Sequence, residues 1–386
     1  MRPGSTAIIA TFSLLFASGC GEGDGAKQAQ PSASPTAQEG ADSMASQDPA
    51  PGRQADAGIP DAEPRPLMQA QVILERQGFG AGIIDGKPGL STRNALAAFQ
   101  EANGLDPTGE LDAPTRAALA RWSAIPATRV VTIPREWGST VYRPVPDDPA
   151  QQAELERLGY ASLEERLAVR FHTTVEVLQA LNPGGRPASA QAQATAGAPA
   201  MPAAASGQFK PGQTIRVPNI GADRIDPARV KDPEWLGTLR SLGVGTDQPE
   251  AARLVVDKSG GWLKAYDASG KLVAAFTVTT GSRHDPLPIG NWGINGISYN
   301  PDFSYDPELF WDVPDSAQEH HLPPGPNGPV GVVWIDLTKE HYGIHGTSEP
   351  ETIGRAQSHG CVRLTNWDAA RLAQMVSAKT KVVFQP

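Results

Sequence analysis

Residues 342–363 read YGIHGTSEPETIGRAQSHGCVR, and they decide the fold and chemistry of the C-terminal third of the chain. A strand-like run ends at His345, and Cys361 follows sixteen residues later in a second glycine-containing turn. A cysteine nucleophile reacts as a thiolate, and a nearby imidazole lowers the thiol pKa and later protonates the leaving amine. We therefore expect His345 and Cys361 on facing loops of one sheet. Backbone amides of Gly360 and Cys361 would then hold an oxyanion.

The sequence around this stretch predicts a β-rich domain over residues 251–386. Glycine-containing turns separate its short apolar runs, and the segment 366–377 has helical spacing. The strand-like runs are 254–256, 262–266, 272–279, 330–336, 342–345 and 382–384. Many strands with few helices favour a mainly antiparallel β-sandwich or barrel-like catalytic domain.

A zinc site is the alternative use of the same side chains. It would take His345, His359 and Cys361 as ligands, with His320 or His321 as a fourth. These residues lack the paired spacing of structural zinc sites, and two cysteines are too few for a thiolate-rich site. We therefore predict no metal and no cofactor.

The N-terminal sequence predicts export and a spacer. Residues 1–20 carry one early positive charge, an apolar run and then small residues before Cys20, which is typical of a secretory signal. Residues 21–64 contain no aromatic side chain and have a strong excess of acidic over basic residues, which indicates a disordered acidic linker. The net charge of −9 argues against nucleic acid as a partner.

Two smaller modules are predicted before the β-rich domain. Residues 65–123 contain three helical runs, with Ser91 as the expected cap of the second and Pro114–Trp122 as the third, and form a small three-helix bundle. Residues 158–219 contain two short helical runs and a final strand, which predicts a small α+β module. An Ala/Gln/Pro-rich insertion at 184–207 interrupts it and is expected to be flexible.

Three family resemblances follow from these motifs. The segment Gly19-Cys20 and the small residues before it resemble a bacterial lipoprotein processing site, in which Cys20 is lipidated. The turn and core positions of 65–123 resemble the three-helix peptidoglycan-binding module, and 158–219 resembles a lysin-motif module that binds glycan. The region 251–386, with its His-Gly-Thr and Ser-His-Gly-Cys-x-Arg motifs, resembles the L,D-transpeptidase catalytic domain of the YkuD type.

The last resemblance implies a role for each motif residue. Cys361 is the nucleophile, His345 is the general base and acid oriented by the Gly346 carbonyl, and Gly360 and Cys361 supply the oxyanion amides. It also places the side chains of Ser358, His359, Arg363 and Tyr342 near the substrate, with a structural role as the alternative for the first three. The Pro/Gly-rich aromatic stretch 292–330 would cover the site as a lid.

The expected function is an exported, periplasmic, lipid-anchored enzyme of the bacterial envelope. It would release D-alanine from a tetrapeptide stem through a thioester at Cys361 and form 3→3 peptidoglycan crosslinks. Its partners would be stem peptides, glycan strands and the membrane, with carbapenem-type β-lactams as covalent inhibitors. The alternatives are an L,D-carboxypeptidase or other hydrolase, a transferase joining a protein lysine to the wall, and a non-catalytic wall-binding protein.

Overall fold

The computed structural model describes residues 59–189, 209–221, 224–309, 313, 314 and 316–386. The predicted signal segment 1–20 with Cys20, and most of the acidic linker, lie outside these residues. So does most of the insertion 184–207. No helix among the described residues is both long and apolar enough to cross a membrane.

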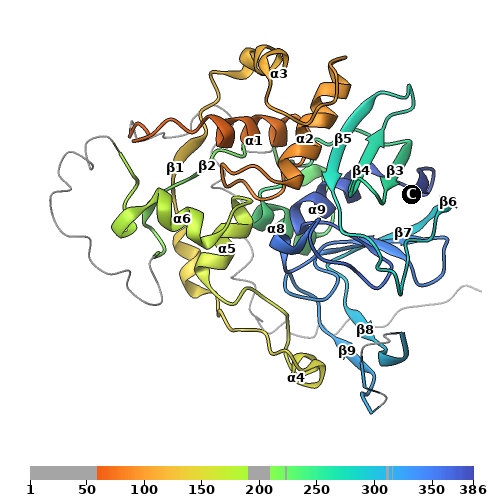
Figure 1. The fold of residues 1–386 in the computed structure, drawn as a ribbon. Coiled ribbons are helices and arrows are strands. Elements are labelled where there is room, and N and C mark those ends of the chain that lie inside the picture. The colour runs from red at the N-terminus through yellow and green to blue at the C-terminus, as the bar shows by residue number, and fades with distance from the viewer. Residues whose placement is uncertain (1–58, 190–208, 222–223, 310–312, 315) are drawn as a thin grey trace, which may run out of the picture. The chain divides into compact units, whose positions relative to one another are not determined.

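Two sheets build the C-terminal region (Figure 1). One has five strands in the order β5-β4-β3-β13-β6, and the other has four in the order β12-β11-β10-β7. The bounds of the first are Leu272–Thr277, Trp262–Tyr266, Arg253–Asp257, Lys381–Gln385 and Gly290–Trp292, and those of the second are Val362–Arg363, Gly343–His345, Val333–Leu337 and Ile294–Tyr299. The strand-like runs of the sequence are therefore present, with ends shifted by up to three residues.

The predicted sheet type was partly wrong. The strands are mainly antiparallel, as predicted, but neither sheet closes into a barrel, and each contains one parallel pair, β13 with β3 and β11 with β12. Parallel neighbours need a crossover connection. Here α9, at Asn366–Met375, lies between β12 and β13 in the chain and allows the last strand to run parallel to β3.

Helices α8 and α9 contribute to the core that both sheets share. Thr365 caps α9 by accepting a hydrogen bond from the Asp368 amide at 3.1 Å. The other helix, α8 at Pro233–Leu242, ends at Gly243, whose φ of 69° is the left-handed conformation usual after a helix. Leu239 of α8 and Leu372 of α9 are fully buried in this core.

The first module is three-helical, as predicted, and packs on the edge of the five-stranded sheet. Its helices are α1 at Pro66–Arg76, α2 at Leu90–Ala102 and α3 at Ala113–Leu119. The Gly80 amide donates to the Ala275 carbonyl at 2.8 Å, and the Ala275 amide donates to Gly78 at 3.1 Å. These bonds cover the free edge of β5, beside which Figure 1 shows α2.

Two details of the helix predictions were wrong. The N-cap of α2 is Gly89 rather than Ser91, which lies inside the helix, and no side chain caps it. The third helix begins with Asp112 as its cap and changes to a 3₁₀ turn after Leu119.

The second module contains one more strand than the sequence predicted. Helices α5 at Leu163–Arg170 and α6 at Val175–Leu181 accompany β2 at Thr214–Pro218, as expected. The partner of β2 is β1 at Thr128–Thr132, which pairs with it antiparallel and precedes the predicted start at residue 158. Ile215 and Leu178 are fully buried in the core between these helices and strands.

The aromatic stretch 292–330 has two parts. Its beginning is not a lid, because β7 pairs with β10 inside the four-stranded sheet. The later part forms a hairpin of β8 at Phe303–Tyr305 and β9 at His320–Leu322. This hairpin lies near the short helix α4 at Pro149–Ala153 (Figure 1).

Candidate active site

The histidine and the cysteine lie at the ends of neighbouring parallel strands. His345 is the last residue of β11 and stands in register with Arg363 of β12. Cys361 immediately precedes β12, so it lies beside Gly343, two residues before His345 on the neighbouring strand. Both predicted residues therefore lie on adjacent strands of one sheet. That their side chains face each other stays a prediction.

His345 is held in one orientation. Its ring is 4% exposed and packs on Trp334, with ring centroids 5.5 Å apart and planes 27° from parallel. Nδ1 lies 2.7 Å from the Gly346 carbonyl oxygen, the contact that the resemblance implied. A carbonyl only accepts hydrogen bonds, so Nδ1 carries the proton and Nε2 is left with a lone pair.

The turn that carries Cys361 is fixed by backbone contacts. Ser358 is 3% exposed, and its hydroxyl donates to the Cys361 carbonyl at 2.6 Å, so this serine braces the turn. Arg363 exchanges two backbone hydrogen bonds with Thr279, at 2.9 and 3.0 Å. The Cys361 thiol donates to the His341 carbonyl, with Sγ and oxygen 3.8 Å apart.

Electrostatics favour a neutral pair at rest. Burial, with the charge of Arg363 acting in the same direction, lowers the pKa of His345 to about 3, and the Gly346 contact opposes this. Burial raises the pKa of Cys361, against a backbone hydrogen bond from Gly343 and the charge of Arg363. The expectation that the imidazole lowers the thiol pKa was therefore wrong for the resting site, because desolvation dominates it. Activation would require proton transfer from sulfur to His345 during the reaction.

The remaining predicted residues surround this pair. The pKa of Tyr342 is raised by burial, and by the neighbouring Cys361 and Asp285. Its ring packs against Gly360, where a Cβ would lie 2.7 Å from Cε1. His359 is half-buried in the same turn. The Nε of Arg363 is buried and has no hydrogen-bond partner within the described part of the chain.

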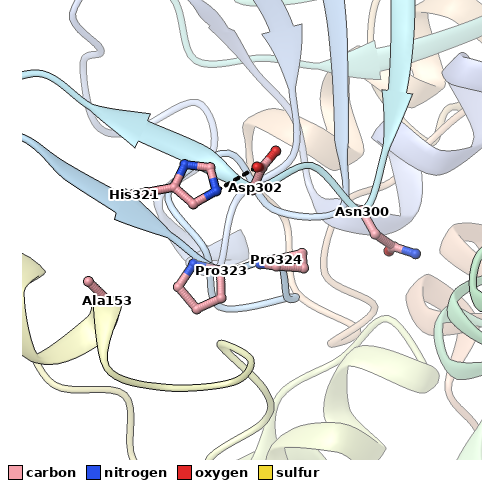
Figure 2. A pocket seen from close by; sticks show the side chains of 6 residues that line it. All are labelled: Ala153, Asn300, Asp302, His321, Pro323 and Pro324. Atoms are coloured by element: carbon pink, nitrogen blue, oxygen red, sulfur yellow. Dashed lines mark ion pairs between the residues drawn. The ribbon is translucent and has the colours of Figure 1, made fainter.

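A separate hollow of about 360 Å³ lies between α4 and the β8–β9 hairpin (Figure 2). In Figure 2 His321 points toward Asp302, and the two form an ion pair at 2.7 Å. None of the predicted site residues lines this hollow. His320 and His321 therefore belong to this hairpin and not to a shared site with Cys361.

Sequence reasoning missed two contributors to the site. Trp334, in β10, packs on His345. Asn366 is buried, and no sequence motif marks it as part of the site. The only available signal for Asn366 was an amide side chain three residues after Arg363, at the start of a predicted helix.

Together these features define a site that carries a buried, oriented histidine and a cysteine in a braced turn, on neighbouring parallel strands of a mixed sheet. Comparison with known proteins agrees with this class. The family model for the L,D-transpeptidase catalytic domain (YkuD) matches residues 251–384, and the model "Putative peptidoglycan binding domain" matches residues 66–119. The chain belongs to the L,D-transpeptidase family.

Individual relatives fit this assignment. The chain is 27% identical over 222 residues to "Putative L,D-transpeptidase YkuD" of Bacillus licheniformis, covering 58% of this chain and 93% of that protein. It is 30% identical over 129 residues to a "Putative L,D-transpeptidase" of Fuscovulum blasticum, covering 33% of this chain and 67% of that one. A solved structure of L,D-transpeptidase 3 from Mycobacterium tuberculosis with a faropenem-derived adduct is 16% identical, with a TM-score of 0.30 over 35% of this chain and 60% of that one.

The conformation of Gly360 leads to a first prediction. Its φ is +109°, and the Tyr342 ring occupies the space that a Cβ would need. We expect Gly360→Ala to displace the Cys361 turn and to slow alkylation of that thiol by iodoacetamide about 10- to 100-fold, since small displacements of reacting groups have such effects. The alkylation rate is measured by quenching the reaction at set times and quantifying the product by mass spectrometry. The measurement uses a Cys20→Ser background, in which Cys361 is the only thiol.

The matched control is Gly270→Ala. Gly270 also has a positive φ, +85°, but nothing lies within 4 Å of the added Cβ. It reproduces the backbone strain of about 1–3 kcal/mol without the clash. Equal alkylation rates in the Gly360 variant and the wild type would contradict the prediction.

Proposed function

We propose that this protein is an L,D-transpeptidase that crosslinks peptidoglycan stems through a thioester at Cys361. The observation that carries the proposal is the fixed orientation of the His345 ring. Its Nδ1 donates to the Gly346 carbonyl, which leaves the lone pair of Nε2 to act as a base. A neutral imidazole on the strand beside that of a neutral thiol suits a general base that works only when substrate is bound.

The proposed reaction has two balanced steps. Nε2 of His345 takes the thiol proton as sulfur attacks the carbonyl between the L-centre and the terminal D-alanine of a tetrapeptide stem. The oxyanion is stabilised by the Gly360 and Cys361 amides, and the proton passes to the departing D-alanine amine, leaving a thioester. The side-chain amine of a diaminopimelate on a second stem then attacks the thioester, loses a proton to His345, and returns the thiol.

Several residues around the pair support substrate binding in this proposal. The cationic Arg363 favours the thiolate form of Cys361, and its unpartnered Nε is a donor available to a carbonyl or carboxylate of the stem. Tyr342 and His359 would contact the stem beside the thiol. A carbapenem-type β-lactam would acylate the same sulfur and block the site.

The N-terminal parts of the proposal concern location. The first module would bind peptidoglycan, and the second, lysin-motif-like module would bind glycan strands. Residues 1–20 would direct export to the periplasm, and lipidation of Cys20 would anchor the enzyme to a membrane. Loss of metabolic labelling with a fatty acid in Cys20→Ser would support the anchor, and an equally labelled variant would refute it.

The test of the catalytic proposal is incubation with disaccharide-tetrapeptide and analysis of products by mass spectrometry, beside Cys361→Ala. We expect a crosslinked dimer lacking one D-alanine from the wild type and no product from the variant. Tripeptide monomer as the only product would indicate an L,D-carboxypeptidase, or a transferase whose acceptor is a protein lysine, in place of a transpeptidase. Unchanged substrate in both samples would favour a non-catalytic wall-binding protein and overturn the proposal.

A further inference from the structure

A buried asparagine joins the catalytic sheet to the loop that follows the β8–β9 hairpin. Asn366, the first residue of α9, is 3% exposed. Its Oδ1 accepts from the Val332 amide at 3.1 Å, and its Nδ2 donates to the Pro326 carbonyl at 2.9 Å. One side chain therefore ties both ends of the segment 326–332.

The same segment is held from its other side by the second module. The Leu158 amide donates to the Pro324 carbonyl at 3.0 Å, and the Asn327 amide donates to Leu158 at 3.0 Å. The Asn327 side chain donates to Glu165 at 2.7 Å and to the Gly159 carbonyl at 3.0 Å. Residues 324–327 are thus clamped between α9 and the segment 158–165.

Asn366 also packs directly on the turn that orients His345. Its Oδ1 and the neighbouring backbone leave no room for a Cβ at Gly346 or at Gly331. The Gly346 amide donates to Val333 at 3.3 Å, and the Gly346 carbonyl is the oxygen that holds Nδ1 of His345. A shift of Asn366 would therefore move the carbonyl that accepts from Nδ1 of His345.

We propose that Asn366 is a positioning residue for His345, and that the clamp of residues 324–327 by the second module supports it. This inference rests on the proposed function, in which His345 is the base. Neither polar atom of Asn366 is free to meet substrate, so its effect passes through Gly346. The second module would then contribute to the geometry of the active site besides any binding of glycan.

The test compares Asn366→Ala and Asn366→Asp with the wild type in D-alanine release. For Asn366→Ala we expect kcat per folded molecule to fall about 10- to 100-fold with KM changed less than about threefold, as for a misplaced catalytic group. For Asn366→Asp at neutral pH, a carboxylate oxygen would face the Pro326 carbonyl. Protonation restores a donor there, so the ratio of its kcat to the wild-type kcat should rise as the pH falls.

Thr380→Val is the matched control. Thr380 is 2% exposed, donates to the Ala251 carbonyl at 2.7 Å and accepts from the Ser377 amide at 3.0 Å, but it precedes β13 in the other sheet. We expect it to lower stability similarly and to leave kcat unchanged. A kcat of Asn366→Ala within twofold of wild type would overturn the proposal, and so would an equal loss of kcat in Thr380→Val. The proposal would also be overturned if the ratio of the Asn366→Asp kcat to the wild-type kcat did not change with pH.

A second readout separates this inference from the proposed function. Alkylation of Cys361 by iodoacetamide needs no peptidoglycan substrate and remains measurable if the wild type releases no D-alanine. We expect Asn366→Ala to react more slowly than wild type near pH 7, with the two rates converging at alkaline pH, where the thiol ionises without His345. Rates that differ by the same factor at all pH values would overturn the positioning role.

Discussion

Replacing His345 by glutamine is expected to slow D-alanine release by about 10²–10⁴-fold, the range that general acid–base catalysis contributes. The wild-type acylation rate should be nearly independent of pH from weakly acidic to neutral conditions. The reason is that burial and Arg363 lower the pKa of His345 to about 3, so the base is unprotonated throughout and is lost only as the pH falls toward that value. In His345→Gln the rate should instead rise about tenfold per pH unit until the thiol ionises.

His321→Gln is the control for this prediction. His321 is exposed, pairs with Asp302 and lies outside the site, so its replacement should leave both the rate and the pH profile unchanged. The measurement is the single-turnover rate of acylation across the pH range. A wild-type profile with an acidic limb near the ordinary histidine pKa of about 6.5 would contradict the argument.

The sequence predicted the chemical pair but not its electrostatics. The motifs around His345 and Cys361 define residue types and turns, and these suffice to place both residues on neighbouring strands of one sheet. The pKa directions depend on burial by residues distant in the chain, such as Trp334 on β10, which no local pattern reveals. For this reason the predicted low thiol pKa was wrong while the predicted contact with Gly346 is present.

The same reasoning explains the errors in the fold. The periodicity of 251–386 indicates strands but not their order, so the parallel pairing of β13 with β3 could not be foreseen. Strand β1 was missed because its partner, β2, lies more than eighty residues away across the interrupted module. Its run of Arg129, Val130, Val131 and Thr132 was the available signal, since β-branched residues favour strands.

A buried charge cluster connects the first module to α9. Oε1 of Glu75, in α1, lies 2.8 Å from Nη1 of Arg371 and 3.1 Å from Nδ1 of His172. Burial opposes ionisation of Glu75, but Arg371 and His172 outweigh it, and its pKa lies below the ordinary value. Burial and the negative Glu75 raise the pKa of the nearby Asp368 to about 8. The cluster therefore holds one carboxylate and one protonated carboxyl at neutral pH.

This arrangement predicts how stability depends on pH. The native pKa of Asp368 lies above its unfolded value, so its contribution is present below the unfolded pKa and is lost as the pH rises toward about 8. Between these limits the free energy of unfolding should fall with pH by up to about 1.4 kcal/mol per unit from this group. Asp368→Asn, which cannot ionise, should remove that slope in urea unfolding measured at several pH values.

The largest loss of stability is expected when both carboxyl groups of this cluster are removed. In Glu75→Gln alone, Asp368 no longer faces a negative neighbour, ionises more readily and supplies a counter-charge for Arg371. In Glu75→Gln with Asp368→Asn, the buried Arg371 loses both of these carboxyl groups, and removing the partner of a buried ion pair costs about 3–5 kcal/mol. The exposed pair of Arg157 and Glu234, 2.6 Å apart, is the control, and Glu234→Gln should cost less than about 1 kcal/mol. If the losses of unfolding free energy in the two single variants add up to the loss in the double variant, Asp368 does not replace Glu75 as the counter-charge, and the assignment of one carboxylate and one protonated carboxyl is wrong.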